Sequence, residues 1–309
     1  MSQPLTTIMV ARLIMPLLLG WTLTLAVSGE ATPLKVATCQ FPVSANLGEN
    51  ANWIRLQMEQ AKQQDAQIVH FSEAALSGYA GVDHQTLDEF DWPRQRLEMA
   101  SILSLAKELK LWVILGATHQ LSGDNKPHNS LYVVNSAGEV VERYDKRFCT
   151  RGDLRHYSPG DHFVTFTVEG VKCGLLICYD IRFPELYRQY KRLNAQLIFH
   201  SFYNARQKPG SIHPKIMPPT AQARAATNSL YISVNNSSAP NSWASLFITP
   251  DGLIANRLPL DKPAVMINIV DLTKQYYDAS EPYRLDSIRG KWNSGDIVID
   301  PRSADRQSY

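Results

Sequence analysis

The fold of this chain is decided by the stretch VKCGLLICYDIRFPEL at residues 171–186. Its apolar first half predicts a buried strand, and the turn that follows, with Pro184 inside it, predicts the start of a helix. Cys178 lies at this strand-to-helix junction. Such a junction presents a side chain at the edge of a sheet, where backbone N–H groups and a helix N-terminus favour a thiolate. Cys178 is therefore a candidate nucleophile, and the alternative is a buried core cysteine.

Two further predicted strands also end in reactive residues. IVHFSEAALSGY at residues 68–79 predicts a buried strand that ends at Glu73, before a loop that contains glycine. VVERYDKRF at residues 140–148 predicts an alternating strand, and Lys146 opens the loop behind it. Taken singly, Glu73 and Lys146 would more often be surface charges in salt bridges. Together with Cys178 they place a Glu, a Lys and a Cys at three strand ends, in that order.

This ordered set resembles the nitrilase, or carbon–nitrogen hydrolase, superfamily, whose catalytic residues are a Glu, a Lys and a Cys in this order. The resemblance runs from about Leu34 to about Asp271. Besides the three blocks above, it rests on Tyr157-Ser158-Pro159-Gly160-Asp161, on Ala223-Arg224-Ala225 with Asn228, on Ser245, and on Pro250-Asp251-Gly252. The motif CYDIRFPEL at residues 178–186 is most similar to the omega-amidase and Nit amidase branch, because true nitrilases usually have Cys-Trp-Glu at its start.

The resemblance implies an α/β fold, a four-layer α-β-β-α sandwich, with Glu73, Lys146 and Cys178 as the catalytic set. Cys178 would attack the carbonyl carbon of an amide, and Glu73 would pass the thiol proton to the departing nitrogen. Lys146 and the backbone N–H of Tyr179 would stabilise the oxyanion. Water activated by Glu73 would then hydrolyse the acyl thioester. The expected reaction converts a small linear amide to ammonia and a carboxylic acid.

Three positions depart from the pattern of the family. Asp153 stands where many members carry a second Glu, and we expect it to orient Lys146 or the attacking water with a shorter side chain. Thr227 replaces a Glu on a helix that in relatives commonly lies near the subunit contact or behind the active site. HSFYNA at residues 200–205 replaces a loop of small residues, which predicts an unusual acyl pocket.

Several alternatives stay open at this point. Arg182 either binds a substrate carboxylate through its planar guanidinium or braces its own loop against Glu185. A Cys–His dyad is the rival mechanism, although the spacing of the eight histidines selects none of them. The alternative functions are an N-carbamoyl (ureido) amidohydrolase, an N-acyltransferase with the same triad, and a non-catalytic scaffold. A scaffold has no need of all three reactive residues, and the acyltransferases carry several membrane spans.

The composition is that of an ordinary enzyme. With 309 residues, 44% of them hydrophobic, the chain can bury one large core. Its 31 Lys and Arg against 29 Asp and Glu leave no charge excess that would recruit nucleic acid or anionic lipid. The sequence has no glycine-rich phosphate loop and no dinucleotide fingerprint, and its four cysteines lack the spacing of a disulfide framework or zinc finger. We expect no cofactor, no metal, a small-molecule amide as partner and a homo-oligomer.

The first thirty residues differ from the rest. Residues 1–12 carry one positive charge, residues 13–27 are mostly apolar, and Ala26-Val27-Ser28 offers small side chains to a signal peptidase. This pattern predicts a secretory leader and an exported or periplasmic protein, and the alternative is a misassigned start codon before a cytoplasmic enzyme. The predicted organisation is a leader at 1–30, a hydrolase domain at 31–282 and a C-terminal tail at 283–309. The tail either packs on a neighbouring subunit or stays loose.

Strands and helices alternate after the leader. The predicted helices cover residues 46–64, 97–109, 184–192 and 220–228, the last announced by Pro218 and Pro219. Besides the strand in the first half of residues 171–186, the predicted strands cover residues 35–41, 68–71, 112–117, 131–134, 140–144, 163–168, 197–199 and 231–235. This order indicates an α/β layer architecture. Periodicity alone does not choose among α/β folds, so the sandwich rests on the resemblance.

Overall fold

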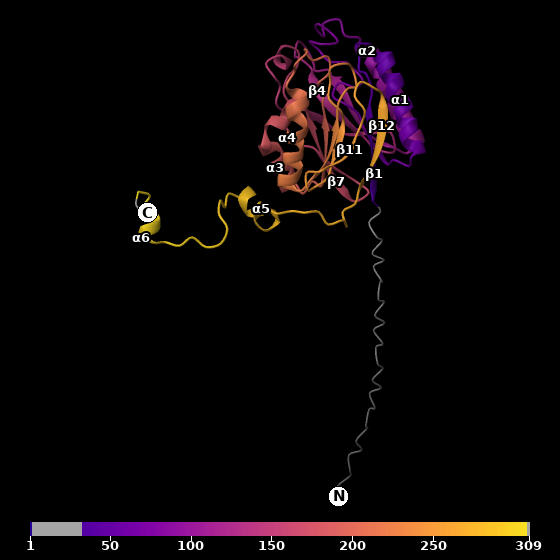
Figure 1. Ribbon diagram of the computed structural model, residues 1–309. Helices are drawn as coiled ribbons and strands as arrows, with labels where there is room; N and C mark the ends of the chain where they lie inside the picture. Colours follow the sequence, from indigo (N-terminus) through magenta and orange to yellow (C-terminus); the bar gives the residue numbers. More distant parts are fainter. Residues whose placement is uncertain (2–32, 308–309) are drawn as a thin grey trace. The chain divides into compact units, whose positions relative to one another are not determined.

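Two six-stranded sheets form the centre of the protein (Figure 1). The computed structural model describes residues 1 and 33–307, so the predicted leader lies, apart from Met1, outside the described residues. The first sheet has the order β12 (Ala264–Val270), β1 (Leu34–Gln40), β2 (Ile68–His70), β3 (Trp112–His119), β4 (His128–Val134) and β5 (Val140–Asp145). The second has the order β11 (Ile254–Arg257), β10 (Leu246–Ile248), β9 (Tyr231–Asn235), β8 (Leu197–Ser201), β7 (Val171–Ile177) and β6 (Thr165–Val168).

Two pairs of helices cover the outer faces of the sheets. Helices α1 (Leu47–Gln63) and α2 (Trp92–Leu109) pack on the first sheet, and α3 (Pro184–Arg192) and α4 (His213–Asn228) pack on the second (Figure 1). Short helices follow at α5 (Glu281–Ile288) and α6 (Pro301–Ala304), with 3₁₀ turns at η1 (Asp153–Arg155) and η2 (Cys178–Arg182). The α-β-β-α sandwich expected from the resemblance is therefore confirmed.

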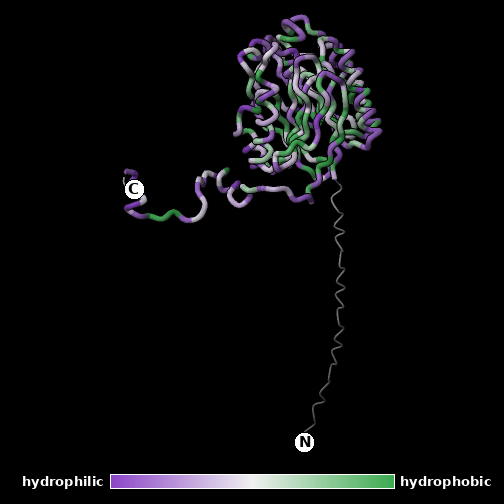
Figure 2. The backbone as a smooth tube through the Cα atoms, viewed as in Figure 1, coloured by the Kyte–Doolittle hydropathy of each residue, from purple (hydrophilic) through white to green (hydrophobic). Residues whose placement is uncertain are grey.

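Side chains along each strand alternate between the two faces of its sheet, and this alternation explains the layers. In β3, Ile114 joins the core between the sheets, whereas Val113 and Leu115 pack with α1 and α2. Successive strand residues point to opposite faces, so a strand covered on both sides is apolar throughout. Figure 2 shows the hydrophobic residues gathered along these central strands.

Parallel pairing at the centre of each sheet brings the candidate site together. Strands β1, β2 and β3 are parallel neighbours, as are β7, β8 and β9. β5 runs antiparallel to β4, which runs antiparallel to β3, so β5 points the same way as β2. The carboxyl ends of β2 and β5 therefore lie at one edge of their sheet, and each leads into a reactive residue.

Some elements differ from the sequence-based expectation. α4 begins at His213, not near residue 220, and Pro218 and Pro219 lie inside it. Proline usually marks the first turn of a helix, but here Pro214 already occupies that position. α2 begins at Trp92, where the side chain of Asp91 accepts a hydrogen bond from the Arg94 N–H. Strands β10, β11 and β12 were not predicted; β10 has three residues, and β11 is mostly exposed.

The C-terminal segment is partly packed on the domain. α5 starts at Glu281 and crosses the expected boundary between residues 282 and 283. Within it, Arg284 is buried and donates a hydrogen bond to the carbonyl oxygen of Thr227, at 3.2 Å. Farther on, Trp292 and residues 297–299 are exposed. Within the described residues, no helix has the length and apolar character that crossing a membrane requires.

Candidate active site

Cys178 is the first residue of the 3₁₀ turn η2, directly after β7. Its φ of 42° lies in the left-handed region, which residues other than glycine rarely adopt. Such strained backbone is often found at functional sites. Asp180 holds the turn: one oxygen accepts hydrogen bonds from the Ile177 N–H (3.0 Å) and the Tyr144 hydroxyl (2.8 Å). Its other oxygen accepts the N–H of Phe148 at 3.0 Å, which ties the turn to the loop that carries Lys146.

Lys146 lies buried between two carboxylates. Its Nζ is 2.8 Å from Glu73 Oε1 and 2.8 Å from Asp153 Oδ2. Burial by itself lowers the pKa of Lys146, but Glu73 and the other negative groups around it raise that pKa well above its ordinary value. Lys146 is therefore a cation. Glu73, Lys146 and Asp153 are called the carboxylate–lysine cluster below.

Glu73 is held by three donors. Its Oε1 accepts hydrogen bonds from Lys146 Nζ (2.8 Å) and Asn129 Nδ2 (2.7 Å), and its Oε2 accepts the backbone N–H of Tyr203 at 2.8 Å. Burial raises the pKa of Glu73 above its ordinary value, and the charge of Lys146 offsets part of that rise. A carboxylate with a raised pKa is suited to accept a proton and give it back near neutral pH.

Close packing of backbone at two glycines sets the positions of Glu73 and Lys146. A Cβ on Gly116 of β3 would lie 2.1 Å from the carbonyl oxygen of Ser72, so only glycine lets the loop at Glu73 cross β3. A Cβ on Gly160 would lie 2.4 Å from the carbonyl oxygen of Asp145. The Gly160 N–H donates to the carbonyl of Lys146 at 2.8 Å, which explains the glycine of the motif after the Lys146 block.

Asp153 contacts Lys146 directly, from the first residue of η1. Its Oδ1 accepts the hydroxyl of Tyr79 at 2.5 Å, and its Oδ2 accepts the N–H of Thr150 at 2.9 Å. Burial alone raises the pKa of Asp153, but Lys146 and these hydrogen bonds lower it below its ordinary value. Asp153 is therefore ionised, and it shares Lys146 with Glu73.

The environment of Cys178 does not favour a thiolate, which differs from the sequence-based expectation. Burial and the neighbouring carboxylate of Glu73 raise the pKa of Cys178, and Lys146 only partly offsets the rise. The junction does carry a helical turn, but the carboxylates of Glu73 and Asp153 stand nearby and oppose a negative charge on the sulfur. A raised pKa favours the thiol, so Cys178 needs a base to remove its proton.

A cavity of about 420 Å³ opens over Cys178 and is called the nucleophile cavity. Its lining includes Lys146, Asp153, Cys178, Tyr179, Arg182, Tyr79, Tyr203, Asn204, Arg155, His156 and His213. Arg182 is exposed there, and it forms no ion pair with Glu185 or with any other carboxylate in the described part of the chain. The structure therefore shows Arg182 at the cavity, without the brace to Glu185 that the sequence left open.

Several residues of the site were missed in the sequence. Asn129, Tyr79, Tyr203 and Asn204 all contact members of the catalytic set or of the carboxylate–lysine cluster. Tyr79 and Asp180 stand inside the blocks already quoted, and Asn204 stands in the segment that departs from the family. No histidine among the described residues hydrogen bonds to Cys178 Sγ. Asn204 Nδ2 lies 3.4 Å from this sulfur, and the backbone N–H of Tyr203 also lowers the pKa of Cys178. Within the same residues, no cluster of metal-ligating side chains is present.

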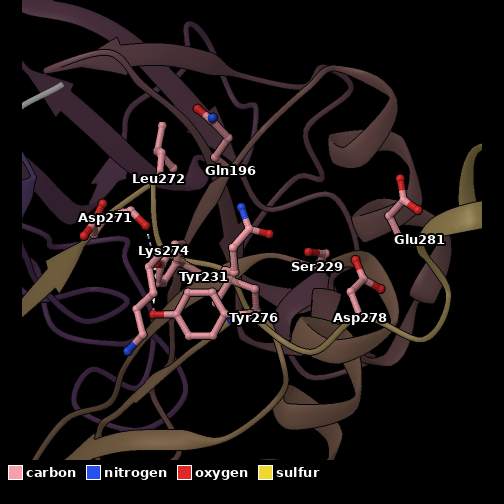
Figure 3. Close-up of a pocket in the computed structure, with 11 residues that line it drawn as sticks. Gln196, Ser229, Tyr231, Asp271, Leu272, Lys274, Tyr276, Asp278 and Glu281 are labelled. Carbon is pink, nitrogen blue, oxygen red and sulfur yellow. Dashed lines mark hydrogen bonds between the residues drawn. The ribbon is translucent and has the colours of Figure 1, made fainter. Parts of the chain in front are cut away.

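A second hollow, of about 550 Å³, lies at the end of β12 and the start of β9 (Figure 3). Its lining includes Gln196, Ser229, Tyr231, Asp271, Leu272, Lys274, Tyr276, Asp278 and Glu281. The Tyr231 hydroxyl donates to the carbonyl oxygen of Asp271 at 2.9 Å, and Lys274 lies over the Tyr276 ring. The lining contains no cysteine and none of the catalytic set. The nucleophile cavity is therefore the candidate active site.

Known proteins share this sequence pattern and this fold. The family model of the carbon-nitrogen hydrolases matches residues 35–277. Nitrilase homolog 2 of Dictyostelium discoideum is 22% identical over 278 residues, covering 82% of this chain and 83% of that protein. An omega-amidase of Homo sapiens is 22% identical over 266 residues, covering 79% of this chain and 95% of that protein. A solved amidase of the nitrilase superfamily from Nesterenkonia AN1 has a TM-score of 0.70 at 19% identity, covering 83% of this chain and 96% of that one.

The family match extends over most of the described residues and includes Glu73, Lys146 and Cys178. The solved structure has the same fold, and the two relatives match over most of their own length. The chain belongs to the carbon-nitrogen hydrolase family, in the Nit branch of the nitrilase superfamily, and it is a cysteine-dependent hydrolase of carbon–nitrogen bonds other than peptide bonds.

Proposed function

We propose that this protein is an amidase that hydrolyses a small linear amide to a carboxylic acid and ammonia. The observation that carries the proposal is the position of Cys178, which faces the nucleophile cavity beside the buried carboxylate–lysine cluster. The omega-amidase among the relatives supports an amide as the substrate. A nitrile has no leaving amine in its first step, in which Glu73 would protonate the nitrogen of a thioimidate, and it is not the substrate that we propose.

The first half-reaction forms a thioester. Glu73 takes the proton of the Cys178 thiol while the sulfur attacks the carbonyl carbon of the amide, so that a C–S bond forms and the carbonyl oxygen becomes an oxyanion. The Lys146 cation and the backbone N–H of Tyr179 stabilise that oxyanion. When the intermediate collapses, the C–N bond breaks, and Glu73 gives its proton to the nitrogen, which leaves as ammonia.

The second half-reaction restores the enzyme. Glu73, again a carboxylate, takes a proton from a water molecule that attacks the thioester carbonyl, and the same cation and N–H stabilise the second oxyanion. The C–S bond then breaks, the carboxylic acid is released and the sulfur recovers its proton from Glu73. Asp153 holds Lys146 from the other side during both steps.

The unpaired cation of Arg182 supports a substrate with a carboxylate at the end remote from the amide. Arg182 lines the nucleophile cavity, and its charge is not neutralised by another described residue. A guanidinium binds a carboxylate through two parallel hydrogen bonds. We therefore propose linear amides that carry a terminal carboxylate as the preferred substrates.

Ammonia release across primary amides, ureido acids and nitriles tests the proposal. We expect release from short amides that end in a carboxylate, together with an acyl adduct on Cys178, seen by intact mass at low pH or trapped by hydroxylamine as a hydroxamate. Cys178→Ala, the matched control, should give neither. Faster turnover of nitriles than of every amide, or ammonia release by Cys178→Ala, would contradict the proposal.

We also propose that the chain is exported by its N-terminal leader and works as a homo-oligomer. The leader composition supports export, and the exposed apolar side chains of Trp292 and of residues 297–299 support an association. Light scattering coupled to size-exclusion chromatography measures the oligomer, and a mass equal to that of one chain would contradict it.

A further inference from the structure

Asn204 lies against the sulfur of Cys178. It follows β8, it is 5% exposed, and its Nδ2 lies 3.4 Å from Cys178 Sγ, within the range of a hydrogen bond to sulfur. It belongs to the segment at residues 200–205 that departs from the small-residue loop of the family. A buried amide therefore lies directly against the nucleophile.

Two hydrogen-bond donors at Asn204 Oδ1, on Trp243 and His213, fix the orientation of the Asn204 amide. Asn204 Oδ1 lies 3.2 Å from Trp243 Nε1, and the indole N–H can only donate. Rotation of the amide by half a turn would place its NH₂ group against that N–H, so the oxygen faces Trp243 and the nitrogen faces Cys178. His213 Nδ1 also lies 3.2 Å from Asn204 Oδ1, so His213 carries its proton on Nδ1 and leaves Nε2 as an acceptor.

The backbone around Asn204 is held as firmly as the side chain. The Asn204 N–H donates to Asn236 Oδ1 at 2.9 Å, and Asn236 Nδ2 donates to the carbonyl oxygen of Trp243 at 2.9 Å. Trp243 is buried and packs edge-on against Phe202. These contacts join the loop after β8 to the loop after β9, so Asn204 cannot turn away from Cys178 without breaking several hydrogen bonds.

We propose that Asn204 is a further catalytic residue, whose N–H group donates to the sulfur of Cys178 and stabilises the thiolate as Glu73 removes the proton. Trp243 and His213 are positioning residues that hold the amide in this orientation. The inference rests on the proposed function, since it assigns a role at the same nucleophile. It names a side-chain donor that offsets the repulsion between the thiolate and the remaining carboxylate, Asp153.

A neutral donor suits this position better than a second cation. Lys146 is already shared by two carboxylates, so its charge is only partly available to the sulfur. A further cation at Asn204 would lower the pKa of Glu73 and weaken it as a base. An amide N–H stabilises the thiolate through one charge-assisted hydrogen bond and has a smaller effect on Glu73, because it carries no net charge.

The test follows the thiolate directly and does not need a substrate. Methyl methanethiosulfonate, a small thiol reagent without an amide group, is reacted with the full chain across a range of pH, and modification of the Cys178 peptide is measured by mass spectrometry. In Asn204→Leu we expect the pH profile to move upward by about one to two pH units, with modification at neutral pH on the order of tenfold to a hundredfold slower. Asn256→Leu, which removes an amide on β11, should match the unchanged protein.

Two further variants test the orientation and guard against a failure of Asn204→Leu to fold. Asn204→Asp keeps the acceptor for Trp243 but replaces the donor with a carboxylate oxygen, so its profile should move upward at least as far. Trp243→Phe keeps an aromatic ring yet removes the indole N–H, so a smaller upward shift is expected. Circular dichroism confirms that each variant is folded.

Profiles that stay unchanged in both Asn204 variants would overturn the inference. So would a rise of KM for amides with an unmoved profile, because Asn204 would then bind substrate and not sulfur. An unshifted Trp243→Phe profile would overturn the role of Trp243 as a positioning residue. If no amide is hydrolysed yet the profiles shift as expected, the proposed function fails and the role of Asn204 at the sulfur stands.

Discussion

Lys146 Nζ lies 2.8 Å from Asp153 Oδ2 although Asp153 is one methylene shorter than the Glu common at its position. The 3₁₀ turn η1 brings the Asp153 backbone near the cluster, and the hydroxyl of Tyr79 and the N–H of Thr150 fix the carboxylate. The shorter side chain therefore still reaches Lys146. Asp153 forms no hydrogen bond with Cys178, and it acts on the sulfur through Lys146 and through its own charge, which raises the pKa of Cys178.

Asp153→Asn should weaken catalysis without abolishing it. The variant removes one of the two charges that hold Lys146 but leaves Glu73 and Cys178 in place, so kcat/KM should fall on the order of tenfold to a hundredfold. Steady-state kinetics beside Cys178→Ala provide the comparison. An Asp153→Asn variant as inactive as Cys178→Ala would give Asp153 a direct part in the chemistry.

The acid side of the pH–rate profile should report Glu73. Burial raises the pKa of Glu73, and a base works only while ionised, so kcat/KM should fall as the pH drops through a value above the ordinary Glu pKa of about 4.3. The charge of Asp153 is one cause of the raised pKa, so in Asp153→Asn this limb should move to lower pH. A limb that stays at the same pH in Asp153→Asn would show that the charge of Asp153 does not affect the pKa of Glu73.

As a replacement for Cys178, glycine should give a more stable protein than alanine. At a φ of 42°, Cys178→Gly should be more stable than Cys178→Ala by up to about 1 kcal/mol, because alanine is strained there. Cys173, in the regular strand β7, provides the matched pair, and there glycine should be less stable than alanine by roughly 0.5–1 kcal/mol. Urea unfolding gives the free energy of unfolding of all four variants. The same order of glycine and alanine at both positions would contradict a strained backbone at Cys178.

Arg182→Ala should separate charged from neutral substrates. The loss of one charge-assisted carboxylate pair should raise KM for amides with a terminal carboxylate on the order of tenfold to a hundredfold, while neutral amides change little. Arg151→Ala removes an exposed arginine outside the nucleophile cavity and is the control. Equal losses on charged and neutral amides in Arg182→Ala would make Arg182 a structural residue.

A chain that begins at Glu30 should fold and hydrolyse the same amides. The first strand, β1, starts at Leu34, and its neighbours β2 and β12 come from later in the sequence. Activity and thermal unfolding of this chain are compared with those of the full-length protein. Loss of solubility or activity in the shorter chain alone would show that residues 1–29 belong to the fold.

The catalytic candidates could be predicted because a local sequence pattern marks each of them. Glu73, Lys146 and Cys178 each follow an apolar run, and their order along the chain matches one superfamily. The sandwich could not be derived from periodicity, because strands covered on both faces are apolar throughout and do not reveal which layer lies on which side.

Other features depend on contacts between distant segments. Asn204 meets Trp243 across 39 residues and Cys178 across 26, and no local pattern predicts such a meeting. The start of α4 was placed too late because a proline pair inside a helix looks like a helix start. The raised pKa of Cys178 was missed for a similar reason: the turn favours a thiolate, whereas the carboxylates that oppose it, Glu73 and Asp153, come from distant parts of the chain.

The carboxylate–lysine cluster holds two carboxylates and one ammonium, which sum to one negative charge in a buried place. When Glu73 takes the proton of Cys178, the cluster becomes neutral and the sulfur becomes the anion. The total charge of the active site is therefore the same before and after the nucleophile forms. Activation moves an existing charge and creates no new one, so it avoids the cost of placing an additional ion beside the buried cluster.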